Sequence, residues 1–181
     1  PVDVVGHRAV PRAAPAAPAP SDTALPEEEP DVPAKDSEDW LLVRAARGRA
    51  GWLLESSADL NPPLEIAQYS EGLRIRAWFE IYREQDAGQP HPWYLWATVR
   101  RLAGLPYDFD EIRVFVWDPK SSRYETSYRE RNLTGYYPIV IGSRETPEGP
   151  SPAFHFGVKD ASGQRVDRKY FMTGRQVHLE H

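Results

Sequence analysis

Residues 73–82, LRIRAWFEIY, alternate between two kinds of side chain with a period of two. This period is typical of a β-strand, because successive side chains point to opposite faces of a sheet. Leucine, isoleucine, alanine and phenylalanine form one face, which we expect to lie in a hydrophobic core. The other face carries arginines and a glutamate together with two large rings, Trp78 and Tyr82. We therefore expect both faces of this strand to be covered by another surface.

Residues 93–99, WYLWATV, repeat the pattern, with Tyr94 and Trp96 opposite a face of Trp, Leu, Ala and Val. Between the two segments, residues 84–92 are predicted to form a loop. Further strand-like runs follow at residues 112–117, 123–131, 136–142, 153–160 and 165–174. Strands at this spacing, separated by short turns, indicate an antiparallel β-barrel or sandwich. We predict one such domain over residues 72–178.

The second face of the first two strands gathers rings and arginines: Trp78, Tyr82, Tyr94 and Trp96, with Arg74 and Arg76 at one end. Two interpretations fit this face. In the one we favour, it packs against the unit at residues 39–60 or against the helix that connects the two units. In the other, it is an exposed platform that binds a glycan or a peptide, with rings for contact area and arginines for hydrogen bonds.

Residues 39–54 predict a smaller β-unit, because two apolar runs flank a turn that contains glycine, as in a β-hairpin. The segment resembles the closing half of bacterial SH3-like domains. These domains show a Trp, alternating apolar residues, a turn that ends in Gly-Trp, and a short apolar strand. The matching residues here are Asp39, Trp40, Leu42, Val43, Gly48, Gly51 and Trp52. The opening half is not recognisable upstream, so it is degenerate, absent from this stretch or interrupted by the preceding segment.

The resemblance implies a small barrel that belongs to an extracytoplasmic protein of the bacterial cell envelope. In such barrels the Trp of the Gly-Trp step packs into the core, since a preceding glycine allows close approach of the backbone. We therefore expect Trp52 to be a core residue. The first Trp of the motif lies at the edge of the ligand groove, so Trp40 joins the candidate ligand-binding residues.

Residues 1–38 have a different composition, rich in proline and alanine and then in acidic residues, with a net charge of −5. Such a segment buries too little apolar surface to offset its ordering entropy, so we predict a largely disordered tether. Val2–Val10 is also compatible with a lone strand, and Pro15–Pro18 has the PxxP spacing of a ligand for an aromatic groove.

A short connecting helix is predicted over residues 61–71, between the two β-units. Pro62 and Pro63 end the preceding strand, and Gly72 provides the glycine that often follows a helix. The final residues 179–181, LEH, look like the beginning of a purification tag and are left out of the predicted fold.

Charge and composition exclude several classes of partner. Residues 39–181 carry equal numbers of basic and acidic side chains, which argues against nucleic-acid binding. The absence of cysteine excludes disulfides, thiolate nucleophiles and zinc–thiolate sites. No apolar run reaches membrane-spanning length, so we expect no membrane insertion. The sequence carries no signal for an oligomeric state.

We expect no catalytic residue, no metal site and no cofactor. His7, His91, His155 and His178 are scattered without the spacing that metal ligands on a helix or hairpin require. Residues 107–111, YDFDE, cluster three carboxylates, which we interpret as a solvated loop that leads into a strand. The chain shows neither a glycine-rich phosphate loop nor a nucleophile elbow.

Two hypotheses of function remain. The first is a non-enzymatic binding module of a bacterial envelope protein, whose ligand is a peptide or a cell-wall polymer. The second is a hydrolase of cell-wall glycan or peptide whose acids come together only in the fold. Close, buried carboxylates or histidines in a cleft favour the hydrolase, whereas a shallow aromatic groove favours the binding module.

Overall fold

The computed structural model describes residues 2–11, 37–45, 48–58, 60–100, 104–147 and 149–180. Strands dominate these residues, and the predicted all-β fold class is confirmed. The chain divides into unit 1, Pro1–Ala58 with Leu102–Pro106, and unit 2, Asp59–Arg101 with Tyr107–His181. In the described part of the chain, no helix combines the length and the apolar character needed to cross a membrane.

Unit 1 contains a three-stranded antiparallel sheet in the order β1-β2-β3. Its strands are β1 (Val2–Pro11), β2 (Ser37–Ala45) and β3 (Ala50–Leu54), and a short 3-10 turn, η1 (Glu55–Ser57), follows them. β2 and β3 form the hairpin predicted from the sequence, and Gly48 in its turn has a φ of 77°, which suits a residue without a Cβ. The resemblance to an SH3-like barrel stays a prediction.

The prediction of a tether over residues 1–38 was wrong at both ends, for Val2–Pro11 and for Ser37 and Glu38, and the alternative of a strand at Val2–Val10 is confirmed. Val2–Pro11 form β1, which pairs with β2 from Val2 opposite Ala45 to Pro11 opposite Ser37. The proline-rich and acidic residues 12–36 lie outside the described residues. Because Pro11 and Ser37 are cross-strand partners, residues 12–36 are an insertion between two paired strands rather than a leader ahead of the unit.

A buried polar cluster around Asp39 holds unit 1 together. Asp39 Oδ1 lies 3.1 Å from His7 Nε2 on β1, and it accepts a hydrogen bond of 3.1 Å from the Gly104 N–H. The His7 and Asp39 side chains are both buried. A buried carboxylate is tolerated only when it is hydrogen-bonded, so Asp39 links β2 to β1 and to the chain segment around Gly104.

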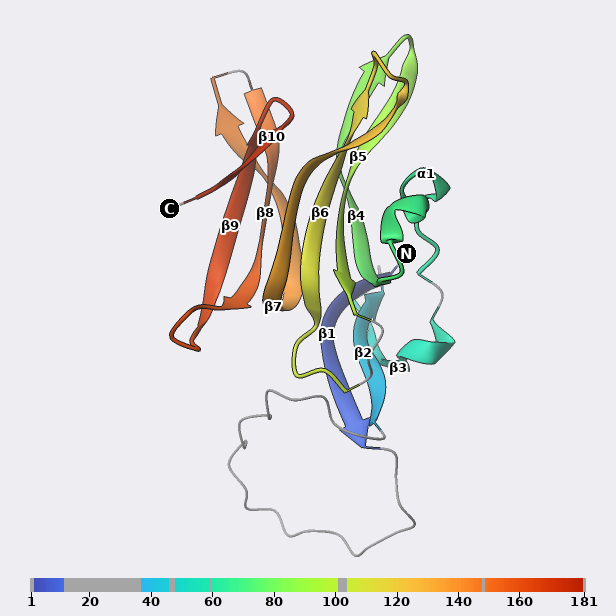
Figure 1. Ribbon diagram of the computed structural model, residues 1–181, viewed down its shortest axis with the longest axis vertical. Helices are drawn as coiled ribbons and strands as arrows, with labels where there is room; N and C mark the ends of the chain where they lie inside the picture. The colour runs from blue at the N-terminus through green and yellow to red at the C-terminus, as the bar shows by residue number, and fades with distance from the viewer. Residues whose placement is uncertain are drawn as a thin grey trace, which may run out of the picture. The chain divides into compact units, whose positions relative to one another are not determined.

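Unit 2 is built on a seven-stranded antiparallel sheet in which each strand pairs with the next one along the chain (Figure 1). The strands are β4 (Arg74–Asp86), β5 (Gln89–Val99), β6 (Phe109–Asp118), β7 (Arg123–Thr146), β8 (Gly149–Lys159), β9 (Arg165–Thr173) and β10 (Gln176–Leu179). This meander agrees with the predicted antiparallel domain over residues 72–178. Leu179 belongs to β10, so leaving it out of the predicted fold was wrong, and the tag origin of residues 179–181 stays a prediction.

Two parts of unit 2 have more strand than the sequence predicted. The loop predicted over residues 84–92 is a hairpin instead, because β4 runs to Asp86 and β5 begins at Gln89. Only Ala87 and Gly88 lie between these strands, with φ of 47° and 77°, the left-handed values of a tight hairpin turn. Residues 123–131 and 136–142 likewise join into β7, a single strand of 24 residues.

The sheet curls so that β7 reaches β4, although β5 and β6 lie between them in the strand order. The Tyr137 hydroxyl on β7 donates a hydrogen bond of 3.0 Å to the Arg76 carbonyl on β4. Gly135 permits close packing here, because a Cβ at this position would lie 2.2 Å from the ring of the buried Phe109. The inner face of the curled sheet carries most of the core of unit 2.

Residues 60–72, which we call the strap, cross the other face of the sheet beside β4 (Figure 1). They contain one helical turn, α1 (Leu64–Ala67), and a 3-10 turn, η2 (Gln68–Ser70). The strap ends in two left-handed residues, Glu71 with a φ of 52° and Gly72 with a φ of 82°. The predicted connecting helix is therefore present, but it is only one turn long.

Deletion of residues 1–11 is expected to remove regular structure from unit 1. The deletion leaves β2 and β3 as an isolated two-stranded hairpin, which is at best marginally stable in water. Amide hydrogen exchange of β2 should accelerate to nearly unprotected rates, whereas exchange in β5 and β6 should not change. Replacement of residues 12–36 by a short Gly/Ser linker is the control and should preserve protection of β2. Unchanged protection after deletion of residues 1–11 would show that β1 is dispensable.

Candidate functional site

Three of the four predicted platform rings lie together but are covered by the strap. Trp78 pairs with Trp96 across β4 and β5, and the rings of Trp78 and Tyr94 lie 6.1 Å apart. Trp96 is fully buried, at 0% exposure, and Tyr94 is buried as well. Both belong to a cluster with Ile66 of α1. The interpretation that this face packs against the connecting helix is confirmed, and the exposed platform was wrong for these three residues.

Specific contacts fix the strap to this face. The Trp78 indole N–H donates a hydrogen bond of 2.8 Å to the Leu60 carbonyl at the beginning of the strap. Towards its end, the Tyr69 hydroxyl donates a hydrogen bond of 3.0 Å to the Tyr124 carbonyl. The Tyr69 ring also lies 5.4 Å from the ring of Phe115. The strap is therefore attached to the sheet both by burial of apolar side chains and by two hydrogen bonds.

Two bulges in β4 separate the remaining predicted residues from the platform. The register shifts between Ile75 and Ala77, and again between Glu80 and Tyr82. Because cross-strand partners share a face, Tyr82 lies with Trp93 on the face opposite Trp78. Arg74, opposite Val99, lies on that face too, and Arg76 is fully buried at the first bulge. The sequence prediction assumed that side chains alternate without interruption along β4, and it therefore put Arg74, Arg76 and Tyr82 on the same face as Trp78.

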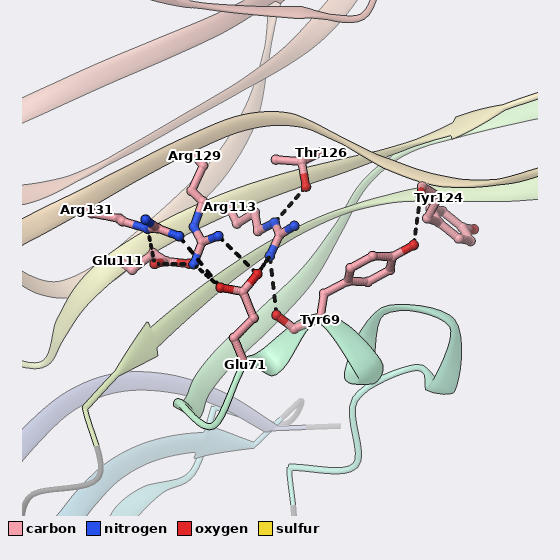
Figure 2. A network of polar contacts seen from close by, with 8 residues as sticks. All are labelled: Tyr69, Glu71, Glu111, Arg113, Tyr124, Thr126, Arg129 and Arg131. Carbon is pink, nitrogen blue, oxygen red and sulfur yellow. Dashed lines mark hydrogen bonds and ion pairs between the residues drawn. The ribbon is translucent and has the colours of Figure 1, made fainter.

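A network of arginines and glutamates surrounds the end of the strap (Figure 2). Glu71 Oε1 accepts hydrogen bonds of 3.1 Å from Arg113 and from Arg129, and Glu71 Oε2 accepts a third of 2.8 Å from Arg129. Arg129 also donates to the buried Glu111 at 2.9 Å, and Arg131 donates to Glu111 at 3.2 Å. Arg113 further reaches the Tyr69 carbonyl at 3.3 Å. Strands β6 and β7 thus hold the strap through charge-assisted bonds.

The network keeps Glu71 ionised. The hydrogen bond from Arg129, with a further one from Arg113, lowers the pKa of Glu71 from its ordinary value of 4.5 to about 2. A carboxyl group with this pKa carries no proton at neutral pH, so it cannot act there as a general acid. The arrangement is suited to fastening the strap.

The carboxylates of residues 107–111 are not the solvated loop that we predicted. Asp108, Asp110 and Glu111 are all buried. Asp108 accepts a hydrogen bond of 2.5 Å from the Tyr137 N–H, and Asp110 pairs with Arg100 at 2.9 Å. Each of these carboxylates is paired, so the cluster serves the junction of β6 with its neighbours.

Tyr82 instead lines a cleft of about 560 Å³ in unit 2. The cleft lies between the β4–β5 hairpin on one side and the β7–β8 hairpin and the β9–β10 turn on the other. Tyr82 is 43% exposed, and its ring lies 4.7 Å from the ring of the buried Trp93. The volume falls in the range of about 300–1000 Å³ that is usual for small-molecule sites. The cleft therefore presents the accessible ring of Tyr82, which packs against the buried ring of Trp93.

Glu84 joins the two sides of the cleft. Its Oε2 accepts a hydrogen bond of 3.0 Å from the Trp93 indole N–H, and its Oε1 accepts one of 2.6 Å from Arg175 in the β9–β10 turn. The Ser127 hydroxyl on β7 donates to the Arg175 carbonyl. The position of the Trp93 ring is thus coupled to that of the β9–β10 turn.

In unit 1 the two tryptophans of the hairpin are arranged differently from our prediction. Trp52 is 50% exposed, so its assignment to the core was wrong. Trp52 pairs with Leu42 and Trp40 pairs with Leu54, which places all four side chains on one face of the sheet. Trp40 is half-buried on this face. The exposed indole is therefore Trp52, the residue that the motif had placed inside.

The histidines among the described residues do not lie together. His7 and His155 each pair with an aspartate, and His91 and His178 stack on Trp117 and Phe171. Within the ranges that the structure describes, no group of three or more His, Cys, Asp or Glu side chains is arranged to hold a metal ion.

Comparisons of the chain with protein-family models, with curated proteins and with solved structures found no match. The geometry of the chain's own residues is therefore the basis for assigning a function.

Sequence reasoning found Tyr82 but missed the rest of the cleft. Trp93 was assigned to the core face, and the β7–β8 hairpin was not considered. A usable signal was the cluster of prolines at positions 147, 150 and 152, since prolines so close together restrict the backbone of a hairpin. The bulge that turns Tyr82 toward Trp93 has no signature in the alternation of side chains.

Substitution of Trp96 and of Trp52 by alanine should affect stability very differently. Trp96→Ala should lower the free energy of unfolding by about 3–5 kcal/mol, because it removes a large ring from a packed cluster. Trp52→Ala should cost less than about 1 kcal/mol, as expected for an exposed side chain. Chemical denaturation followed by circular dichroism measures both values. A larger loss for Trp52→Ala would mean that this ring is covered in solution.

Acid should weaken the attachment of the strap. The pKa of Glu71 is about 2 in the folded chain and near 4.5 when unfolded, so its contribution is complete above pH 4.5 and disappears as the pH falls toward 2. Glu71→Gln should cost only about 0.5–1 kcal/mol at pH 7, since Glu71 is largely exposed to solvent. The variant should also lose less stability than the wild type between pH 5 and pH 2.

The control is Glu65→Gln, which removes a carboxylate from the same segment without breaking a described ion pair. Its melting temperature should follow the wild-type curve over the same pH range. Identical acid dependence of the wild type and Glu71→Gln would show that the Arg129–Glu71 contact does not stabilise the fold.

Proposed function

We propose that this protein is a non-enzymatic binding module of a bacterial envelope protein, and that its ligand is a peptide or polymer of the cell wall. The observation that carries the proposal is the cleft of unit 2, in which Tyr82 is exposed over the buried Trp93. The envelope location and the SH3-like character of unit 1 derive from the resemblance of residues 39–54.

Tyr82 is an exposed ring that lies against the buried ring of Trp93. Tyr82 presents a flat apolar surface of the kind that contributes strongly to recognition, because an aromatic side chain loses little conformational freedom on binding. Trp93 lies against it, and Glu84 hydrogen-bonds the Trp93 indole. A ligand that stacks on Tyr82 thus meets a preorganised surface and incurs little ordering cost.

One pair of close carboxylates in unit 2, Glu71 and Glu111, does not favour the alternative, a hydrolase. Glu71 and Glu111 meet at Arg129, which donates to them at 2.8 Å and 2.9 Å. A glycosidase of two carboxyl groups needs one of them protonated at the working pH. The pKa of Glu71 is about 2, so Glu71 is not the protonated acid, and arginines bind both carboxylates of this pair.

Retention on insoluble peptidoglycan tests the proposal. The wild type should co-sediment with purified sacculi, and Tyr82→Ala should reduce the bound fraction at least about tenfold, since an aromatic anchor in a binding site contributes roughly 1.5 kcal/mol or more. Tyr82→Phe keeps the ring and should bind nearly as the wild type does. Val166→Ala is the matched control, because Val166 is exposed to a similar degree and lies outside the lining of the cleft.

Three outcomes contradict the proposal or the cleft that carries it. Failure of the wild type to co-sediment removes the cell wall as the ligand. Release of soluble muropeptides or loss of turbidity during incubation shows hydrolysis and supports the enzyme. Equal retention of Tyr82→Ala and the wild type, with loss in Trp52→Ala, moves the binding surface from the cleft to unit 1.

A further inference from the structure

We infer that β3 is the site at which two copies of this chain associate, by antiparallel pairing of β3 with β3 of the second copy, centred on Trp52. The inference concerns unit 1 and does not depend on the cleft of the proposed function. It depends on the exposed apolar side chains of β3, on the direction of its backbone N–H and C=O groups, and on the opposite charges at its two ends.

Among the described edge strands, β3 is the least protected against pairing with another chain. Soluble proteins usually protect such edges with charges, bulges or very short strands. The edge strands β1 and β4 are interrupted by bulges, and β10 has only four residues, two of them polar. β3 reads AGWLL and pairs with β2 without a bulge. Trp52 is 50% exposed, and Leu53, on the opposite face, is 37% exposed, so both faces of this edge present apolar surface.

The backbone of Trp52 points away from β2. At the hairpin turn, the Ala45 N–H donates a hydrogen bond of 2.8 Å to the Arg49 carbonyl. Hydrogen-bonded and non-hydrogen-bonded positions alternate along an antiparallel pair, and the register from this turn onward has no interruption. Gly51 and Leu53 therefore bond to β2, whereas Trp52 between them directs its N–H and C=O groups outward. No other described strand pairs with β3 on that side.

The charges at the ends of β3 identify a second copy as the partner. Arg49 precedes the strand and Glu55 follows it, at equal distances along the sequence from Trp52. In an antiparallel pair with Trp52 opposite Trp52, Arg49 of each copy lies next to Glu55 of the other. Opposite charges at cross-strand positions stabilise a pair and like charges destabilise it, so a parallel pair is disfavoured.

The side chains of β3 fit the same register. Cross-strand partners share a face, so the two exposed Trp52 rings lie side by side and cover one another. Leu53 of each copy lies opposite Gly51 of the other, and a Cβ added at Gly51 would meet no atom within 4 Å, so this side has open space. The two copies exchange backbone hydrogen bonds at Trp52 and join their three-stranded sheets into one.

The association is expected to be closed and weak. The two copies are related by a two-fold axis and use the same edge, so pairing ends at a dimer. One pair of five-residue strands buries less surface than a stable complex usually does, so the monomer should predominate below about 10 μM. Dilute samples, such as those used for circular dichroism, then contain the monomer with its exposed Trp52.

Concentration dependence of the full chain tests the inference. Sedimentation velocity should show the monomer at about 10 μM and a growing fraction of dimer toward about 1 mM. Over the same range, amide hydrogen exchange should slow strongly at Trp52. Exchange at Gly51 and Leu53, which already donate to β2, should change much less. This alternation distinguishes edge pairing from contact through a face of the sheet.

Reversal of charge tests the register. Arg49→Glu and Glu55→Arg each place like charges together at both ends of the paired strands, and each should weaken the dimer by roughly 3- to 10-fold. An equimolar mixture of the two variants restores opposite charges in the mixed dimer and should associate nearly as the wild type does. Lys120→Glu is the matched control, because it changes the net charge as Arg49→Glu does but lies in an exposed turn of unit 2.

Trp52→Lys provides an independent route if a charge-reversed variant does not fold. It places a charge at the centre of the pair and should abolish the dimer up to about 1 mM, while circular dichroism shows that the strands are retained.

Four outcomes overturn the inference. They are a wild type that stays monomeric up to about 1 mM, a dimer that survives Trp52→Lys, and folded charge-reversed variants that associate no more strongly when mixed than alone. The fourth is protection of the Trp52 amide that does not depend on concentration and is lost when residues 12–36 are replaced by a Gly/Ser linker. That result would show that a segment of the same chain covers β3.

Discussion

Burial of the second face of the β4–β6 sheet beneath the strap is the contact on which unit 2 depends. A single antiparallel sheet buries one face easily, but Trp78, Tyr94, Trp96 and Phe115 make the other face apolar as well. Ile66 and Tyr69 cover these rings, and Trp96 is left with no exposed surface. The strap is short and has one helical turn, so its stability must come from this contact rather than from its own helix.

The polar network at the end of the strap follows from the same constraint. The strap has only one helical turn, so its own hydrogen bonds do not fix the position of its final residues. Arg113 and Arg129 fix that position through their hydrogen bonds to Glu71. The buried Glu111 in turn needs Arg129 and Arg131, because an unpaired buried carboxylate is costly. Arginines therefore bind both Glu71 and Glu111, which line a second cleft of about 450 Å³. The cleft around Tyr82 differs from it because it presents an exposed aromatic ring.

Two bulges in β4 determine which of its side chains lie on each face of the sheet. The bulge at Arg76 buries a guanidinium group, and the one before Tyr82 turns that ring away from the strap and toward Trp93. The same strand thus contributes Trp78 to the packed face and Tyr82 to the cleft. A bulge costs one regular pair of the ladder, and here it produces an exposed ring beside a buried one.

The sequence by itself determined the β class, the β2–β3 hairpin, an antiparallel β-domain over residues 72–178 and the presence of a second aromatic face, because these depend on local periodicity and composition. It also placed the connecting helix correctly. Tertiary structure decided the rest. The pairing of β1 with β2 across residues 12–36, the exposure of Trp52, the burial of the acidic run around Asp110 and the position of Tyr82 all depend on contacts between distant segments. Alternation predicts which residues share a face only while the register holds, and a single bulge reverses every assignment beyond it.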